Sequence, residues 1–245
     1  MNGKIIFIVL FNFSCLNGMI VAAKECLYKK QEQFNDMKSE LKIMTRLNAA
    51  SVIQVYGYSL FNEKKNELDY EDGEDEYNHY FVMIMEKADT SLDKVLKEPC
   101  SIEKKKMYIL QIAHGLWILR FNGLCHGDLK LDNVLMVDGN CKLADFGLSH
   151  FIPTNEMEAK QKFTFGNLVQ YVLVLSIKFS RAPELYRIDY GEKIDPAVLQ
   201  QMLLKADVYA LGMMISEILS GETETFAWLN GESKVVTDPD VRIVS

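Results

Sequence analysis

Residues 125–150 read CHGDLKLDNVLMVDGNCKLADFGLSH, and this stretch decides how the rest of the chain is interpreted. Asp128 and Asn133 lie five residues apart, and Asp145 follows twelve residues after Asn133. Between them, VLMVDGNCKLA reads as two short strands around an Asp-Gly turn, which is a strong hairpin signal. A hairpin at this place would fold Asp145 back beside Asp128 and Asn133.

The residue types in this stretch suit the transfer of a phosphoryl group. That chemistry needs carboxylate and amide oxygens to hold Mg²⁺, lysine to neutralise phosphate charge, and a separate carboxylate to meet the incoming hydroxyl. Asp128, Asn133 and Asp145 supply the oxygens, and Lys130 supplies a cation two residues after Asp128. The stretch therefore contains the parts of a phosphoryl-transfer site.

Composition and charge set the class of protein. With 245 residues, 49% of them hydrophobic, the chain has material for one large domain or two lobes with a real core. The net charge is -7, and residues 63–76 alone hold eight acids against two lysines, a net of -6. This acidic run is interpreted as a solvated loop, with an interaction segment as the alternative. No basic stripe is visible, so we expect no nucleic-acid partner.

Five cysteines without a CxxC pair predict neither a disulfide framework nor a zinc site, and indicate a reducing, cytoplasmic location. Residues 1–15 have a lysine followed by an apolar run, which resembles a signal peptide. We interpret the run as a buried strand or a misassigned start, and keep secretion as the minor alternative. The run is too short to span a bilayer as a helix, so a membrane location is not expected.

The first part of the chain predicts a sheet with one helix. Strands are expected at 19–25, 51–61 and 80–87. Apolar residues recur at helical spacing from Gln33 to Leu47, with Glu40 on the inward edge. A carboxylate in that place needs a cation, because an unpaired buried charge is costly.

The second part predicts helices around the hairpin. Met107 to Leu119 repeats apolar residues at helical spacing, and another helix is expected from about Leu199. The latter segment is apolar on nearly every face, which is typical of a helix buried at the centre of a domain. Asp207 and Glu217 interrupt it, which argues against a membrane span.

Taken together, six motifs resemble those of the eukaryotic protein kinase catalytic domain, in the same order and at compatible separations. They are VAAK (21–24), SELKIMTRL (39–47), HGDLKLDN (126–133), DFG (145–147), APE (182–184) and DVYALG (207–212). The resemblance covers about residues 19–225. It implies an α+β, two-lobed protein-kinase-like fold, with a small β-rich lobe at 1–87 and a larger, mainly helical lobe at 88–245.

The resemblance implies a role for each matched residue. Lys24, held by Glu40, would contact the α- and β-phosphates of ATP. Asp128 would accept or orient the substrate hydroxyl, and Lys130 would neutralise the γ-phosphate. The Mg²⁺ ligands that it implies are Asn133 and Asp145.

Further positions follow from the same resemblance. Met85 falls at the gatekeeper position, and Glu86 to Ala88 would hydrogen-bond adenine through the backbone, with Ala22 and Leu135 as further nucleotide contacts. Asp207 would hold the catalytic loop by accepting its backbone N–H groups. Four residues match the family's stacked hydrophobic spine: Met44, Val55, His126 and Phe146. Because His126 belongs to this spine, its implied role is structural rather than that of a base.

The resemblance implies an ATP- and Mg²⁺-dependent protein kinase. Lys130 after Asp-Leu resembles serine/threonine kinases, so the expected substrates are serine and threonine hydroxyls of proteins. The alternative is a catalytically impaired pseudokinase or truncated kinase that acts as a binding or scaffold module. The enzyme is favoured because the chain retains the residues that the chemistry needs, which are Lys24, Glu40, Asp128, Asn133 and Asp145.

Two departures concern regulation and nucleotide binding. Gly127 replaces the arginine that in many family members binds a phosphate on the activation loop, so we expect a kinase that is not switched by that phosphate. No GxGxxG precedes Lys24, where only Gly3 lies at the family's spacing, and this should weaken nucleotide binding.

Two further departures lie toward the C-terminus. Removing residues 172–180 would leave GNLVQYRAPE, close to the family pattern, so these nine residues are interpreted as an untranslated intron or a genuine insertion. The chain ends sixty-one residues after Glu184, which leaves the expected arginine partner of Glu184 and several helices unaccounted for. We expect a fold of reduced stability.

Overall fold

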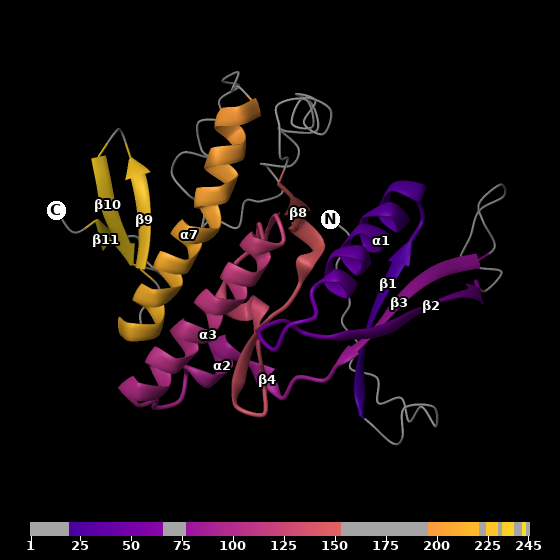
Figure 1. Cartoon of the computed structure of the whole chain (residues 1–245), viewed down its shortest axis with the longest axis horizontal. Helices are drawn as coiled ribbons and strands as arrows, with labels where there is room; N and C mark the ends of the chain where they lie inside the picture. The colour runs from indigo at the N-terminus through magenta and orange to yellow at the C-terminus, as the bar shows by residue number, and fades with distance from the viewer. Residues whose placement is uncertain are drawn as a thin grey trace.

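The fold is described from a computed structural model of the chain, shown in Figure 1. It describes residues 20–65, 77–152, 196–220, 224–229, 232–237 and 242–243, with side chains in 20–65, 77–152 and 205–220. The α+β architecture expected from the sequence is confirmed. The strands are β1 (Val21–Tyr28), β2 (Val55–Lys64), β3 (Tyr77–Glu86), β4 (Thr90–Ser91), β5 (Leu124–Cys125), β6 (Val134–Val137), β7 (Asn140–Leu143), β8 (His150–Phe151), β9 (Glu224–Leu229), β10 (Glu232–Thr237) and β11 (Arg242–Ile243). The helices are α1 (Gln31–Arg46), α2 (Leu92–Val95), α3 (Ile102–Phe121) and α7 (Pro196–Ser220), with short 3₁₀ turns η2 (Leu131–Asn133) and η3 (Phe146–Leu148).

An antiparallel sheet with the order β1-β3-β2 forms the first part of the described chain. β3 is the middle strand, and its Phe81 and Met83 side chains are fully buried. β1 pairs with β3 along its whole length, so that Lys24 stands opposite Met83. The register fixes the height of the Lys24 side chain along the sheet.

The strand expected at 51–61 begins later than predicted. Its first residues form a connection instead, because their backbone groups bond to β7 of the hairpin. Leu143 N–H donates to Ser51 O at 2.8 Å, and Ile53 N–H donates to Leu143 O at 3.0 Å. β2 therefore starts at Val55, and the connection ties the sheet to the second part of the chain.

The helix expected at 33–47 is confirmed as α1, two residues longer at its start. The Gln33 side chain accepts the backbone N–H groups of Lys29 and of the N-cap residue Lys30 at 2.8 and 3.1 Å, which satisfies a donor at the helix start and the donor just before it. The buried face, at spacings of three and four residues, consists of Met37, Glu40, Ile43 and Met44. A carboxylate thus lies on the apolar face of α1.

The hairpin expected between Asn133 and Asp145 is confirmed as β6 and β7. Asp138 and Gly139 form its turn with φ of 48° and 76°, the left-handed backbone that a two-residue hairpin turn requires. The turn is anchored, because Asp138 N–H donates to the Asp89 carboxylate at 3.0 Å.

α3 contains the helix expected at 107–119 and extends it at both ends. The Ser101 hydroxyl accepts Lys104 N–H at 3.4 Å and so caps its first turn. The buried positions recur every three or four residues and pack α3 against β7: they are Tyr108, Ile112, Gly115 and Leu119. Gly115 is the point of closest approach, because a Cβ built there would stand 2.8 Å from Leu143 Cδ1 and 3.2 Å from Ser51 O.

Gly115→Ala is expected to destabilise the protein by roughly 1–3 kcal/mol, as overpacking of a core does. Helix propensity alone would favour alanine by about 1 kcal/mol, but Leu143 is 1% exposed and has no room to withdraw. Urea unfolding of both proteins measures the difference. Gly212→Ala is the matched control, since nothing lies within 4 Å of a Cβ at that helical position; equal or greater stability of Gly115→Ala would contradict the close packing.

The helix expected from about Leu199 is confirmed as α7, but its predicted burial on nearly every face is wrong for the part whose side chains are described. Among residues 205–220 only Ala210, Met214 and Ile218 are buried, at intervals of four residues, whereas Val208 is 66% exposed. Among the described elements, α7 contacts α3, β5 and β9. No helix within the described residues is long and apolar enough to cross a membrane.

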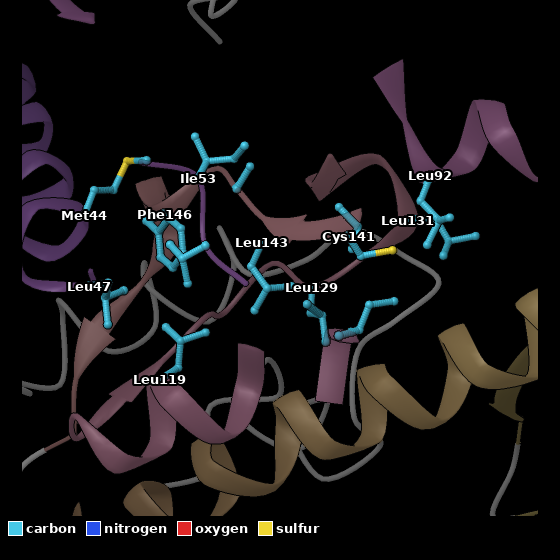
Figure 2. Close-up of a cluster of buried hydrophobic side chains, with 14 of the residues drawn as sticks. Met44, Leu47, Ile53, Leu92, Leu119, Leu129, Leu131, Cys141, Leu143 and Phe146 are labelled. Atoms are coloured by element: carbon cyan, nitrogen blue, oxygen red, sulfur yellow. The ribbon is translucent and has the colours of Figure 1, made fainter. Parts of the chain in front are cut away.

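A single hydrophobic cluster joins the sheet, α1, α3 and the hairpin (Figure 2). Figure 2 shows Met44 of α1 and Leu47, the residue after α1, near Phe146, with Leu143 and Leu119 in the same cluster. The cluster therefore packs around the residues that lead into and out of Asp145. The division into lobes at residues 87 and 88 stays a prediction.

Candidate active site

Lys24 is the meeting point of two carboxylates. Its Nζ donates to Glu40 Oε1 at 2.5 Å and to Asp145 Oδ1 at 3.0 Å. Lys24 and Glu40 are 6% and 4% exposed, whereas the side chain of Asp145 is 35% exposed. β1, α1 and the second residue after β7 thus contribute one charge each to a common cluster.

The electrostatics of this cluster keep Lys24 protonated. Burial of the ammonium by itself lowers its pKa, but the negative charges of Glu40 and then of Asp145 raise the pKa above the ordinary lysine value. The site consequently holds a permanent cation next to Asp145.

Asp145 reaches this cluster through a strained backbone. Its φ of 58° lies in the left-handed region, which costs a residue other than glycine roughly 1–2 kcal/mol. The neighbouring backbone holds it there, since Ala144 N–H donates to Asn133 O at 2.9 Å and Leu143 is bonded to the connection before β2. Strain of this kind, held by surrounding bonds, is typical of functional positions.

Asp128, Lys130 and Asn133 form a second cluster on the loop before β6. Lys130 Nζ donates to Asp128 Oδ2 at 2.9 Å, and Asn133 Nδ2 donates to the same oxygen at 2.9 Å and to Asp128 O at 2.7 Å. The turn η2 brings Asn133 back over Asp128, with Asn133 N–H donating to Lys130 O at 3.0 Å. The two clusters are joined by the bond between Ala144 and Asn133.

The oxygen donors fit the magnesium ion that the sequence predicts. Asn133 uses its Nδ2 atom on Asp128, which leaves its amide oxygen as the group suited to a metal, and Asp145 offers a carboxylate. Mg²⁺ prefers oxygen ligands and binds through one or two protein groups together with phosphates and water. Within the described side chains, no group of three or more His, Cys, Asp or Glu residues could hold a metal by itself.

Asp207 of α7 holds the backbone just before Asp128. Its two carboxylate oxygens accept His126 N–H at 2.7 Å and Gly127 N–H at 3.0 Å. Gly127 has a φ of 80°, in the left-handed region that glycine adopts without strain. Gly127, which replaces the arginine found in many family members, therefore fits this backbone conformation better than an arginine would.

His126 is structural, as the resemblance implied. It is fully buried, and its ring centroid lies 5.1 Å from that of Phe146. Its Nδ1 accepts Asp128 N–H at 3.3 Å, so its Nε2 carries the proton and donates to Ala144 O at 3.1 Å. Both ring nitrogens are therefore engaged in holding the backbone around Asp128 and Asp145.

The residues expected at the adenine end lie in β1, β3 and β6 and in the connection between β3 and β4. Ala22 stands opposite Met85 in the sheet, and both side chains are half-buried, as are Ala88 and Leu135. The N–H of Glu86 already donates to Gln54 O at 2.8 Å. An adenine contact from Glu86 would therefore use its carbonyl oxygen.

Cys100, Cys125 and Cys141 are free thiols. Cys125 and Cys141 are buried, and burial raises the pKa of the Cys141 thiol to about 12. These two side chains pack in the core as neutral thiols. Gly3, the segment 172–180 and the motif at 182–184 lie outside the described residues.

Comparison with known families shows the class of protein. The model of the protein kinase domain family matches residues 11–239, and the chain belongs to this family. The fold is accordingly that of a protein kinase domain, and kinases of this family use ATP and a divalent metal.

Individual relatives are distant. Cyclin-dependent kinase F-3 of Oryza sativa subsp. japonica is 30% identical over 58% of this chain and 28% of its own length. Dual specificity protein kinase TTK of Mus musculus is 28% identical over 81% of this chain and 21% of its own, and cysteine-rich receptor-like protein kinase 27 of Arabidopsis thaliana is 25% identical over 91% and 33%. The chain thus spans a third or less of the length of these relatives.

Proposed function

We propose that this chain binds Mg²⁺ and ATP and transfers the γ-phosphoryl group to serine or threonine hydroxyls of protein substrates. The observation that carries the proposal is the position of the Lys24 ammonium, bonded to both Glu40 and Asp145 although these residues lie far apart in the sequence. A backbone bond from Ala144 to Asn133, and a bond from the Asn133 side chain to Asp128 O, then connect this cluster to Asp128. Kinase membership by itself would not require these side chains to meet.

The chemistry follows from positioning and charge. Bound Mg²⁺ would supply Lewis-acid stabilisation of the triphosphate charge. Lys24 would hold phosphate oxygens from the sheet side, while Asn133 and Asp145 would hold the metal. Asp128 would orient the incoming hydroxyl and accept its proton, and Lys130 is placed beside it to offset charge that develops on the transferred group.

The preference for serine and threonine rests on Lys130 and on the relatives. Lys130 follows Asp-Leu in the sequence and lies 2.9 Å from the Asp128 carboxylate. The relatives include a G-type lectin S-receptor-like serine/threonine-protein kinase of Arabidopsis thaliana, 23% identical over 93% of this chain, and a dual specificity kinase. These names support the proposal that the acceptor of the phosphoryl group is a serine or threonine hydroxyl of a protein.

A binding or scaffold module is the second candidate. It is favoured by the sequence before Lys24, which has no recognisable GxGxxG, the backbone clamp that covers the phosphates in kinases. A chain of that kind would bind nucleotide weakly or not at all and act through contacts with other proteins.

The test is Mg-ATP turnover on casein and on a basic protein, followed by phosphoamino-acid analysis. We expect phosphoserine or phosphothreonine that forms only with Mg²⁺ present. Phosphotyrosine alone would retain the kinase and contradict the alcohol specificity. Background turnover, equal to that of the Asp128→Ala variant, would instead support the scaffold.

A further inference from the structure

The Glu86 carboxylate, at the end of β3, bonds to two other elements of the fold. Its Oε1 atom accepts Lys142 Nζ at 2.6 Å, and its Oε2 atom accepts the backbone N–H of Gln54 at 3.2 Å. The side chains of Lys142 and Glu86 are 14% and 16% exposed, so the pair is largely withdrawn from water. Glu86 N–H also donates to Gln54 O, which closes a ring of bonds around Gln54.

Each element in this cluster leads to a different part of the candidate site. Gln54 ends the connection that follows α1, the helix with Glu40. Glu86 begins the segment 86–88, whose backbone is proposed to contact adenine. Lys142 lies in β7, three residues before Asp145. The cluster therefore connects the chain that follows α1, the helix with Glu40, to the segment 86–88 and to the strand that leads to Asp145.

Lys142 faces the site rather than the core. It stands directly opposite Leu135 in the antiparallel hairpin, and opposed residues project from the same face. Its neighbours Cys141 and Leu143 project from the other face and are buried. Lys142 thus shares a face with a proposed nucleotide contact, yet its charge is directed to Glu86.

We propose that Glu86 and Lys142 form a positioning pair that fixes the segment 86–88 relative to Asp145. The inference rests on the proposed function, because it assigns the pair a role in holding adenine and the Mg²⁺-bound phosphates at the right separation. Neither residue needs to touch the nucleotide through its side chain. The pair acts through the backbone that connects each residue to the site.

A coupling of this kind has a specific signature. A nucleotide gains from the fixed separation only when its base and its metal-bound phosphates are engaged together. Loss of the pair should therefore reduce the gain in affinity that Mg²⁺ provides, and should affect binding without Mg²⁺ much less. A purely structural ion pair would alter stability and leave that gain unchanged.

The experiment measures the dissociation constant of ADP by calorimetry, with saturating Mg²⁺ and with EDTA, for the whole chain and four variants. Lys142→Met removes the charge and keeps the length, Glu86→Gln keeps the shape, and Lys142→Arg keeps the pair. Lys97→Met is the control, because Lys97 pairs with Asp93 across 3.5 Å and is 72% exposed. We expect the affinity gain from Mg²⁺ to fall about fivefold or more in Lys142→Met and Glu86→Gln, which is the size of a modest coupling between sites.

The same gain should be retained in Lys142→Arg and Lys97→Met. An unchanged gain in folded Lys142→Met and Glu86→Gln would overturn the positioning role while leaving nucleotide binding intact. If Lys142→Met does not fold, Glu86→Gln decides, since it retains an acceptor for Gln54 N–H. Absence of ADP binding by the unaltered chain would overturn the proposed function itself.

Discussion

Asp128→Ala is expected to lower Mg-ATP turnover by about a hundredfold or more, the contribution typical of a positioned acid-base group. The Asp128 Oδ2 atom accepts both Lys130 Nζ and Asn133 Nδ2, so one oxygen is held in place by two donors. A carboxylate held in this way can orient a hydroxyl without first reorganising. Initial rates of phosphate transfer at saturating ATP measure the effect, and ADP affinity should change little.

The control for this variant comes from the same loop. Asp132 lies between Lys130 and Asn133 but is exposed, so Asp132→Ala should keep nearly the full rate. Equal losses in both variants would indicate general damage to the loop. A rate in Asp128→Ala close to that of the unaltered chain would remove Asp128 from the chemistry.

Lys24→Met is expected to destabilise the fold by roughly 3–5 kcal/mol, because removing one partner leaves a buried charge uncompensated. Glu40 is 4% exposed and lies on the apolar face of α1, where water cannot replace the ammonium. Asp145 is affected less, since its side chain is 35% exposed. Urea unfolding measures the change in free energy.

The double variant Lys24→Met, Glu40→Leu separates charge burial from packing. Replacing both members of a buried pair by apolar residues of similar size is often neutral for stability. We expect it to recover most of the stability lost in Lys24→Met, while turnover stays at background. A double variant as unstable as Lys24→Met would show that the loss comes from packing rather than from the unpaired Glu40 carboxylate.

The segment after Asp145 is fastened to the loop before Asp128 by bonds that need no phosphate. β5 pairs with β8, and Ile152 N–H donates to Gly123 O at 2.7 Å. The Ser149 hydroxyl donates to His126 O at 2.8 Å. These contacts agree with the prediction from Gly127 that an activation-loop phosphate is not required, which stays a prediction.

Much of the fold could be predicted because the signals are local. The spacing of apolar residues predicted the start of α1 to within two residues and that of α3 to within five, and Asp138-Gly139 predicted the β6–β7 hairpin. Each signal depends on side chains within one or two turns of each other. The prediction failed at residues 51–54, where the apolar pattern suited a strand but distant bonds from Leu143 took up the backbone. It also failed for α7, since periodicity cannot say which neighbours will cover a helix.

The sequence by itself determined the kinds of residue that the site contains, their order, and the resemblance to protein kinases that the family comparison confirmed. Only the tertiary structure decided that Lys24 bonds to Asp145, which lies 121 residues further along the chain, and that Glu86 forms an ion pair with Lys142. Nothing in the local pattern marks Lys142, since any exposed face of a strand accepts a lysine. Such pairs depend on the packing of the sheet and α1 against the hairpin, which brings together charges that the chain keeps far apart. Burial then makes pairing obligatory, because an isolated charge in that interior would be too unstable to keep.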